Sequence, residues 1–237
     1  MIFHRARIKI PNDGSVVSIN NCIIEQSECL KYLGVILDSK ISWIPHIAYV
    51  KNKISKGIGI MYQARKYIDK KSLVNLYNSY IYPYLIYCIE SWGNAPKCHP
   101  DLLFIIQKRI IRIITFAKYD APSDIIFRHL NILPLYNLVQ NRIALLMYKK
   151  VNGMLPEVMS ELYTSNNEIH DHFTRQCNMF HTNKGNTNVY MRSFCNVSPR
   201  IWNAIQRKIN VNVSIVVFKT FLKLYLQEHL LEINYSK

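Results

Sequence analysis

The pattern of hydrophobic and polar residues divides the chain at about residue 45. Before that point, apolar residues alternate loosely or form short runs, as strands do, with a strong turn signal at Pro11-Asn12-Asp13-Gly14. After it, apolar residues recur at helical spacing. The pattern predicts an α+β fold, mostly α, in which a small N-terminal antiparallel β segment precedes a helical bundle and a mixed C-terminal region.

The stretch 30–38 carries the strongest strand signal. Most of its residues are apolar or strand-favouring, and Asp38 and Ser39 are residues that commonly end a strand. Gly34 inside the stretch allows a close backbone approach or a bulge. Pro45 follows shortly afterwards and suits the first turn of a helix, where its missing N–H costs nothing. We therefore expect a strand that leads directly into a helix.

Helical spacing continues for most of the remaining chain. Asp69 can cap the second helix, and Pro83 bends or breaks it. Further helices are expected at about 100–118 and 135–151, and a last one after a cap at Ser214. The first helix carries an apolar stripe formed by Ile47, Val50, Ile54, Ile58 and Met61.

Apolar periodicity fades between about residues 164 and 200, which predicts a long loop or a small irregular subdomain. We accordingly divide the chain into parts 1–44, 45–160 and 161–237. The faded stretch holds metal-capable side chains, but their spacing differs from that of standard zinc sites, so polar loop packing is the alternative. These residues are His170, His172, Cys177 and His181.

Charge narrows the possible partners. The 237 residues hold 30 Lys and Arg against 15 Asp and Glu, giving a formal net charge of +15. Such an excess indicates a polyanion, with nucleic acid as the first candidate and an anionic membrane as the second. The window 72–89 carries no charge, but two asparagines, Pro83 and five tyrosines favour a buried, kinked helix pair over a membrane span. We expect no membrane partner.

Two groups of cations are candidate phosphate contacts. Lys51, Lys53 and Lys56 lie off the apolar stripe of the first helix. Lys108, Arg109 and Arg112 point outward from the helix expected at about 100–118, and Lys108 and Arg112, four positions apart, are in line on one face. An ordinary solvated face is the alternative, but no acidic residue occurs between positions 102 and 118, which favours binding. Arg175 either contacts phosphate or holds its loop by hydrogen bonds to carbonyl oxygens. Six cysteines without a CxxC pair and without a secretory signal indicate reduced thiols inside the cell.

Several motifs in order resemble one family. KYLGVILD, then SWIPHI, a lysine-bearing helix, LIYPYLIYCIESWGN and QKRIIRIIT resemble the end of the palm, the thumb and the C-terminal helical region of reverse transcriptases from non-LTR (LINE-like, jockey-type) retrotransposons. The resemblance implies that Tyr32, Leu33 and Gly34 form the hairpin that serves as the primer grip, which holds the 3′ end of the growing strand. It further implies an RNA or RNA–DNA primer-template as a partner, bound without sequence specificity, in the nucleus or cytoplasm.

The catalytic chemistry of that family is missing from the chain. Such polymerases hold two Mg²⁺ ions with paired aspartates, and no Asp-Asp pair occurs in these 237 residues. We expect a truncated fragment that holds no cofactor and lacks polymerase activity alone, with the upstream palm and fingers as a possible partner. The isolated carboxylates Asp38, Asp69, Glu90 and Asp124 occupy capping or terminal contexts. The alternative function is a non-enzymatic basic helical interaction module, or a transposon relic, that binds a protein partner.

Overall fold

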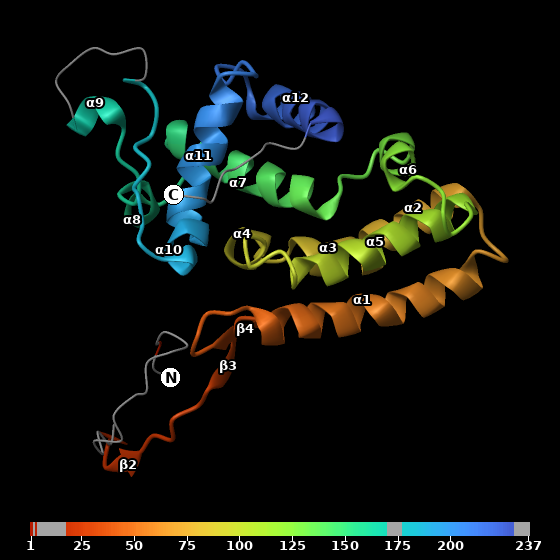
Figure 1. Cartoon of the computed structure of the whole chain (residues 1–237), viewed down its shortest axis with the longest axis horizontal. Coiled ribbons are helices and arrows are strands. Elements are labelled where there is room, and N and C mark those ends of the chain that lie inside the picture. Colours follow the sequence, from red (N-terminus) through yellow and green to blue (C-terminus); the bar gives the residue numbers. More distant parts are fainter. Residues whose placement is uncertain (2, 4–17, 170–176, 230–237) are drawn as a thin grey trace.

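The computed structural model describes residues 1, 3, 18–169 and 177–229, and Figure 1 shows their arrangement. Two separate antiparallel hairpins form the N-terminal part: β1 (Ser18–Ile19) with β2 (Cys22–Ile23), and β3 (Cys29–Tyr32) with β4 (Val35–Asp38). All other described elements are helices. The expected α+β, mostly α, fold class is confirmed. The strand-like pattern that precedes the turn signal at Pro11-Asn12-Asp13-Gly14 lies outside the described residues, apart from positions 1 and 3.

The stretch 30–38 forms a hairpin instead of one continuous strand. Leu30 pairs with Leu37 and Tyr32 with Val35, so the chain reverses at Leu33 and Gly34. Both turn residues have positive φ, 45° and 84°, as two-residue turns between twisted strands require. Gly34 therefore serves the turn, where a residue without a Cβ adopts this conformation at little cost, and not a bulge.

The helices form a bundle with a C-terminal layer, and their main expected starts and ends are confirmed. Pro45 lies in the first turn of the first helix, and the Asp69 carboxylate accepts the Ser72 N–H at 3.3 Å. Ser214 holds the capping position of the last helix, but its side chain makes no capping hydrogen bond. The helices are α1 (Ile44–Ala64), α2 (Lys70–Tyr80), α3 (Tyr82–Ile86), α4 (Ile89–Trp92), α5 (Pro100–Thr115), α6 (Ser123–His129), α7 (Leu135–Val151), α8 (Glu157–Ser160), α9 (Asn166–Ile169), α10 (Asn188–Arg192), α11 (Phe194–Gln206) and α12 (Ile215–Glu228).

The stretch 164–200 is more helical than its composition indicates. The helices α9 and α10 lie within it, and α11 begins at Phe194 even though Pro199 lies inside that helix. The fully buried Val197, Ile201 and Trp202 explain why: packing of one apolar face stabilises a helix whose propensity is poor. The expectation of an irregular segment up to residue 200 is therefore wrong in its last part.

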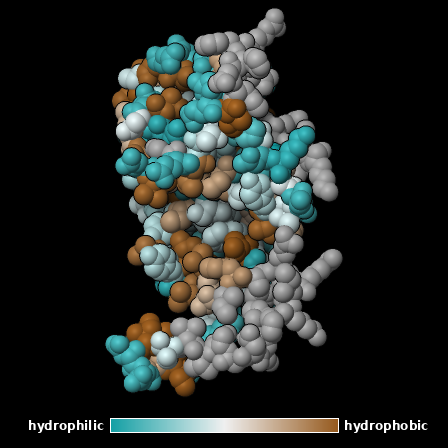
Figure 2. Space-filling model, turned by 90° about the vertical axis from the view of Figure 1, so that its left-hand side faces the viewer, coloured by the Kyte–Doolittle hydropathy of each residue, from teal (hydrophilic) through white to brown (hydrophobic). Residues whose placement is uncertain are grey.

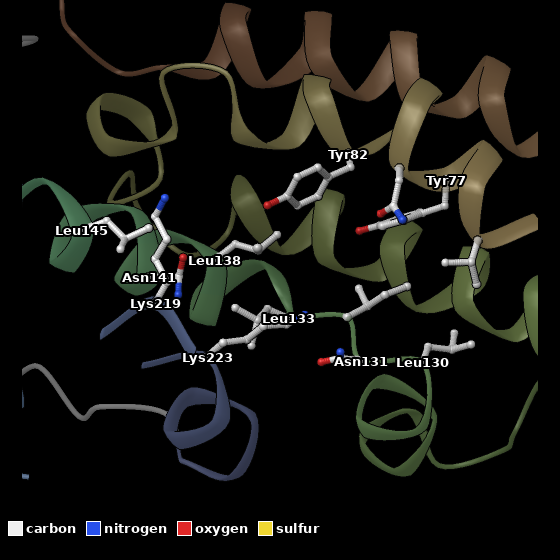
Figure 3. Close-up of a pocket in the computed structure, with 13 residues that line it drawn as sticks. Tyr77, Tyr82, Leu130, Asn131, Leu133, Leu138, Asn141, Leu145, Lys219 and Lys223 are labelled. Carbon is white, nitrogen blue, oxygen red and sulfur yellow. The ribbon is translucent and has the colours of Figure 1, made fainter. Parts of the chain in front are cut away.

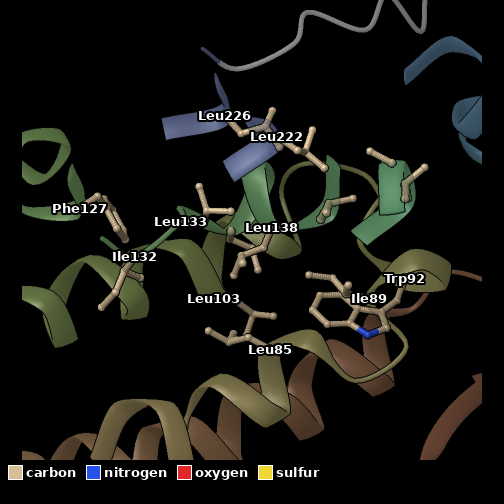
Figure 4. Close-up of a cluster of buried hydrophobic side chains, with 14 of the residues drawn as sticks. Leu85, Ile89, Trp92, Leu103, Phe127, Ile132, Leu133, Leu138, Leu222 and Leu226 are labelled. Atoms are coloured by element: carbon tan, nitrogen blue, oxygen red, sulfur yellow. The ribbon is translucent and has the colours of Figure 1, made fainter. Parts of the chain in front are cut away.

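One connected core joins α1 to α12. Its buried residues run from Ile47 to Leu226, and Figure 4 shows side chains from α3, α4, α5, α7 and α12 meeting in it. Trp202 and Phe218 are both fully buried, as a core role requires. The division into three parts stays a prediction, although this core crosses the proposed boundary at residue 160. Within the described ranges, no helix is both long enough and apolar enough to cross a membrane.

Candidate nucleic-acid interface

The tip of the β3–β4 hairpin is exposed and firmly held. Tyr32 is 60% exposed and Leu33 is 74% exposed, so both side chains point away from the protein core. The Tyr87 phenol donates a hydrogen bond to the Leu33 carbonyl at 2.5 Å. The same ring closely covers Gly34, because a Cβ there would lie 3.3 Å from Tyr87 Cε1. The segment after α3 thus clamps the three residues that the resemblance assigns to a primer grip.

The base of the hairpin is fixed to the start of α1. The Asp38 carboxylate is buried and accepts the N–H groups of Ser42 and Trp43 at 2.9–3.0 Å. His46 of α1 accepts the Ile36 N–H on Nδ1 at 3.3 Å. Because these bonds join the strand and the helix on both sides of the connecting loop, the hairpin cannot rotate freely about α1.

Burial lowers the pKa of His46 below its ordinary value of 6.5. The unfolded chain therefore takes up a proton before the folded chain does as the pH falls. The stability that neutral His46 contributes is complete above about pH 6.5 and is lost as the pH falls from there through the folded-state pKa. We expect the free energy of unfolding in urea to fall from pH 7.5 to pH 5.5.

A variant isolates this contribution. His46→Asn keeps an acceptor near the position of Nδ1 but does not titrate, so its free energy of unfolding should fall less over the same pH range. Equal falls in the parent and in the variant would assign the pH dependence to other histidines.

The cations predicted on α1 lie on two sides of the helix. Lys53 and Lys31 of β3 both lie over the Tyr49 ring, at 5.5 Å and 5.3 Å from its centroid, so the hairpin and α1 contribute to one basic surface. Lys56 lies on the same side as Lys53, but Lys51 is about 160° away from Lys53 around the helix, since successive residues are about 100° apart. The structure thus brings Lys53 beside Lys31 of the hairpin, whereas Lys56 lies about one turn further along the same side of α1 and Lys51 lies on the opposite flank.

The cations predicted on α5 belong to a different part of the surface. Lys108 lies 4.2 Å from the centroid of Phe104, a ring that stacks on Phe127 of α6. Arg112 donates through Nε and Nη2 to the Ala121 carbonyl, at 3.0 Å and 2.9 Å, and so braces the loop before α6. Arg109 is exposed. Three of the five N–H donors of Arg112 remain for a phosphate, so its contact with nucleic acid stays a prediction.

Sequence reasoning missed an aromatic and cationic cluster where α1 and α5 end. The Arg65 guanidinium carbon lies 4.7 Å from the centroid of Phe116 and 5.7 Å from that of Tyr62. Both rings are about half exposed. Exposed rings beside arginine suit base stacking combined with phosphate contact. The sequence signals were a Tyr and an Arg three residues apart near the end of α1, and an aromatic residue directly after α5.

The remaining site and metal-ligand predictions concern residues 170–181. Arg175, His170 and His172 lie outside the described residues. Cys177 is paired with its neighbour Asn178, and the His181 backbone N–H is bonded to the Thr164 carbonyl. Over the ranges 18–169 and 177–229, no group of three or more His, Cys, Asp or Glu side chains is placed to hold a metal ion. All six cysteines are free thiols.

An open groove lies at the hairpin end of the molecule. It encloses about 860 Å³ between the start of α1, the loop after α4 and the helices α10 and α11. Its walls are mainly apolar and include Trp43, Ile44, Pro96 and Phe194. Figure 2 shows this end of the molecule, where apolar residues interrupt the hydrophilic surface.

Comparison with known proteins gives one consistent set of relatives. The RNA-directed DNA polymerase from mobile element jockey of Drosophila melanogaster is 30% identical over 128 residues, which are 53% of this chain and 14% of that protein. The probable RNA-directed DNA polymerase from transposon BS of the same species is 27% identical over 122 residues, 49% of this chain and 13% of that protein. The probable RNA-directed DNA polymerase from transposon X-element of Drosophila melanogaster is 24% identical over 124 residues, 51% of this chain and 14% of that protein.

The similarity is confined to part of each protein. It covers about half of this chain and only a small share of each relative's length. No family model and no solved structure matches the chain. The resemblance to retrotransposon reverse transcriptases is confirmed over that half.

Proposed function

We propose that this chain, similar over about half its length to the RNA-directed DNA polymerases of mobile elements, grips template-primer nucleic acid without reading its sequence. Its ligand is RNA or an RNA–DNA primer-template inside the cell, in the nucleus or the cytoplasm. The observation that carries the proposal is the fixed hairpin, whose exposed Tyr32 and Leu33 adjoin the basic surface of Lys31 and Lys53, with Lys56 about one turn further along α1.

The chemistry of this surface fits backbone contact better than base recognition. Lysine ammonium groups attract phosphates regardless of sequence, and such contacts position a strand without specifying it. A rigid hairpin adds positional restraint that flexible lysine side chains cannot supply, because a fixed apolar tip can hold the end of a nucleic-acid strand at one position. Asp38, His46 and Tyr87 supply that rigidity from three separate elements or loops.

We further propose that the chain does not polymerise nucleotides by itself. Two-metal catalysis needs carboxylates that converge on adjacent Mg²⁺ ions, and the chain contains no Asp-Asp pair. Three of its described carboxylates have structural partners: Asp38 and Asp69 accept backbone N–H groups, and Glu90 pairs with Arg142 of α7 at 3.0 Å. These residues do not fit a catalytic Mg²⁺ site, so no catalytic step is assigned to them.

A second candidate function is that of a protein-interaction module. The groove beside α1 favours it, because open apolar walls of this size commonly receive a partner. The partner that the family resemblance supplies is the palm and fingers part of a retrotransposon polymerase.

Binding to primer-templates separates the two functions. We expect fluorescence anisotropy at 50 mM salt to show binding to two RNA–DNA primer-templates of equal length and unrelated sequence, with affinities that differ by less than about threefold, because phosphate contacts dominate. A large preference for one sequence would contradict the sequence-independent grip. An absence of binding at low salt would contradict the nucleic-acid function and would favour the groove as the functional surface.

A further inference from the structure

A second cavity lies on the other side of α2 and α3 from α1, as Figure 3 shows. It encloses about 500 Å³, which is within the usual range for small-molecule sites. Three parts of the bundle build it: α2 with α3, α7 with the loop before it, and α12. The grip proposed above does not use any of its lining residues.

The charge of this cavity is entirely positive. Lys219 and Lys223 of α12 line it, and none of its lining residues is acidic. Neither lysine forms an ion pair with a carboxylate in the described part of the chain. Partial burial lowers the pKa of Lys223, so its ammonium group is held in an environment that does not neutralise its charge. A bound anion would supply the missing countercharge.

The other walls offer surfaces for a flat, partly polar ring. Leu133 and Leu138 form an apolar floor, and Figure 3 shows the Tyr82 ring on the wall opposite Lys223. Asn78 and Asn141 also line the cavity, and among the described residues no hydrogen bond uses their side-chain amides. Amide groups can pair with the donor and acceptor edges of a nucleobase.

The position of the two lysines is fixed by packing elsewhere on α12. Gln227 donates to Asn131 on the cavity rim at 2.7 Å, and Asn137 of α7 donates to the Leu226 carbonyl. The Phe218 ring stacks on Tyr148 with 4.5 Å between centroids. These contacts hold α12 against α7 on both sides of the lysine pair, so the cavity is preformed.

We propose that this cavity binds a nucleotide, with its phosphate held by Lys219 and Lys223 and its base between Tyr82 and the floor of Leu133 and Leu138. The nucleotide is either a free monophosphate or an unpaired terminal nucleotide of a strand. This site is separate from the proposed template-primer grip and does not depend on it.

The test measures binding of AMP, inorganic phosphate and a 5′-phosphorylated single-stranded hexanucleotide to the full chain by calorimetry. We expect AMP or the hexanucleotide to bind, and the Lys219→Ala/Lys223→Ala variant to bind it at least about tenfold more weakly, because two charged hydrogen-bond donors are lost. The control Lys149→Ala/Lys184→Ala removes the same charge from exposed positions outside the cavity and should bind like the parent.

A second variant tests the base contact. Tyr82→Leu should weaken AMP several-fold and leave inorganic phosphate unchanged, because stacking on an aromatic ring contributes to base binding only. The comparison of AMP with the hexanucleotide identifies the source of the nucleotide. The proposal is overturned if neither ligand binds, if the control loses as much affinity as the cavity variant, or if phosphate binds as tightly as AMP and Tyr82→Leu changes nothing.

Failure of this proposal can be distinguished from failure of the proposed grip. The Lys219→Ala/Lys223→Ala variant should keep its affinity for a blunt-ended RNA–DNA duplex, which has no unpaired nucleotide, within about twofold, since its hairpin and α1 surfaces are intact. If the parent chain binds AMP but no primer-template, the proposed grip is contradicted while the proposed cavity site is supported.

Discussion

Changing Lys53, Lys56, Lys108 and Arg109 to alanine together is expected to flatten the salt dependence of primer-template binding. Each lost phosphate contact lowers the magnitude of the log-log slope by about 0.9, so four contacts lower it by about 3.6. Between about 50 and 200 mM salt, the parent should then lose about 150-fold more affinity than the variant does. Fluorescence anisotropy across a salt series measures both slopes.

The matched control removes four cations from other surfaces. Lys97, Lys149, Lys184 and Lys208 are exposed and lie outside α1, α5 and the hairpin. Both variants lower the formal net charge of +15 by four, so an effect of overall charge would change both slopes equally. Equal slopes in the two variants would contradict a localised interface. Arg112 is kept in both because its guanidinium braces the Ala121 carbonyl.

Trp92→Ala is expected to lower the free energy of unfolding by about 3–5 kcal/mol, the usual cost of removing a fully buried large aromatic side chain. Trp92 is 0% exposed, its indole N–H donates to the Tyr87 carbonyl at 2.9 Å, and its ring meets His46 edge-on at 5.7 Å between centroids. It thus supports two of the three residues that hold the hairpin, Tyr87 and His46. Urea unfolding followed by circular dichroism measures the loss.

The two buried tryptophans provide an internal comparison. Trp92→Phe keeps most of the ring but loses a hydrogen bond, which contributes about 1 kcal/mol. Trp202 is equally buried, but its Nε1 has no hydrogen-bond partner in the described structure, so Trp202→Phe removes an unsatisfied donor. We expect Trp92→Phe to destabilise the chain more than Trp202→Phe. The reverse order would show that the bond to Tyr87 contributes little.

The hairpin shows how much of the candidate site could be predicted from local sequence. The strand-favouring residues and Gly34 predicted extended structure at 30–38, and the family resemblance predicted a hairpin at Tyr32, Leu33 and Gly34. The Tyr87 clamp was not predictable, because Tyr87 is 54 positions from Leu33 in the chain and nothing in its local pattern distinguishes it from the other tyrosines of the uncharged window. Its role arises only when the segment after α3 returns to the hairpin.

The basic residues show the same limit. Their number and the absence of acidic residues between positions 102 and 118 could be read from the sequence. The sequence did not show which of these basic residues lie together. In the structure, Lys53 and Lys31 share the Tyr49 ring, while Arg112 is bound to a loop carbonyl. Glu90 was placed near a helix terminus, as expected, but its partner Arg142 lies on α7, 52 positions away.

The sequence by itself determined where the main helices begin and which face the first one buries: Pro45 and Asp69 mark two helix starts, and the apolar stripe of α1 marks its buried face. The tertiary structure alone decided which faces meet, which cations share a surface, and that Lys219 and Lys223 border a cavity with Tyr82. The physical reason is that helical periodicity is a property of neighbouring residues. Contact between helices depends instead on shape and packing across segments that are far apart in the chain.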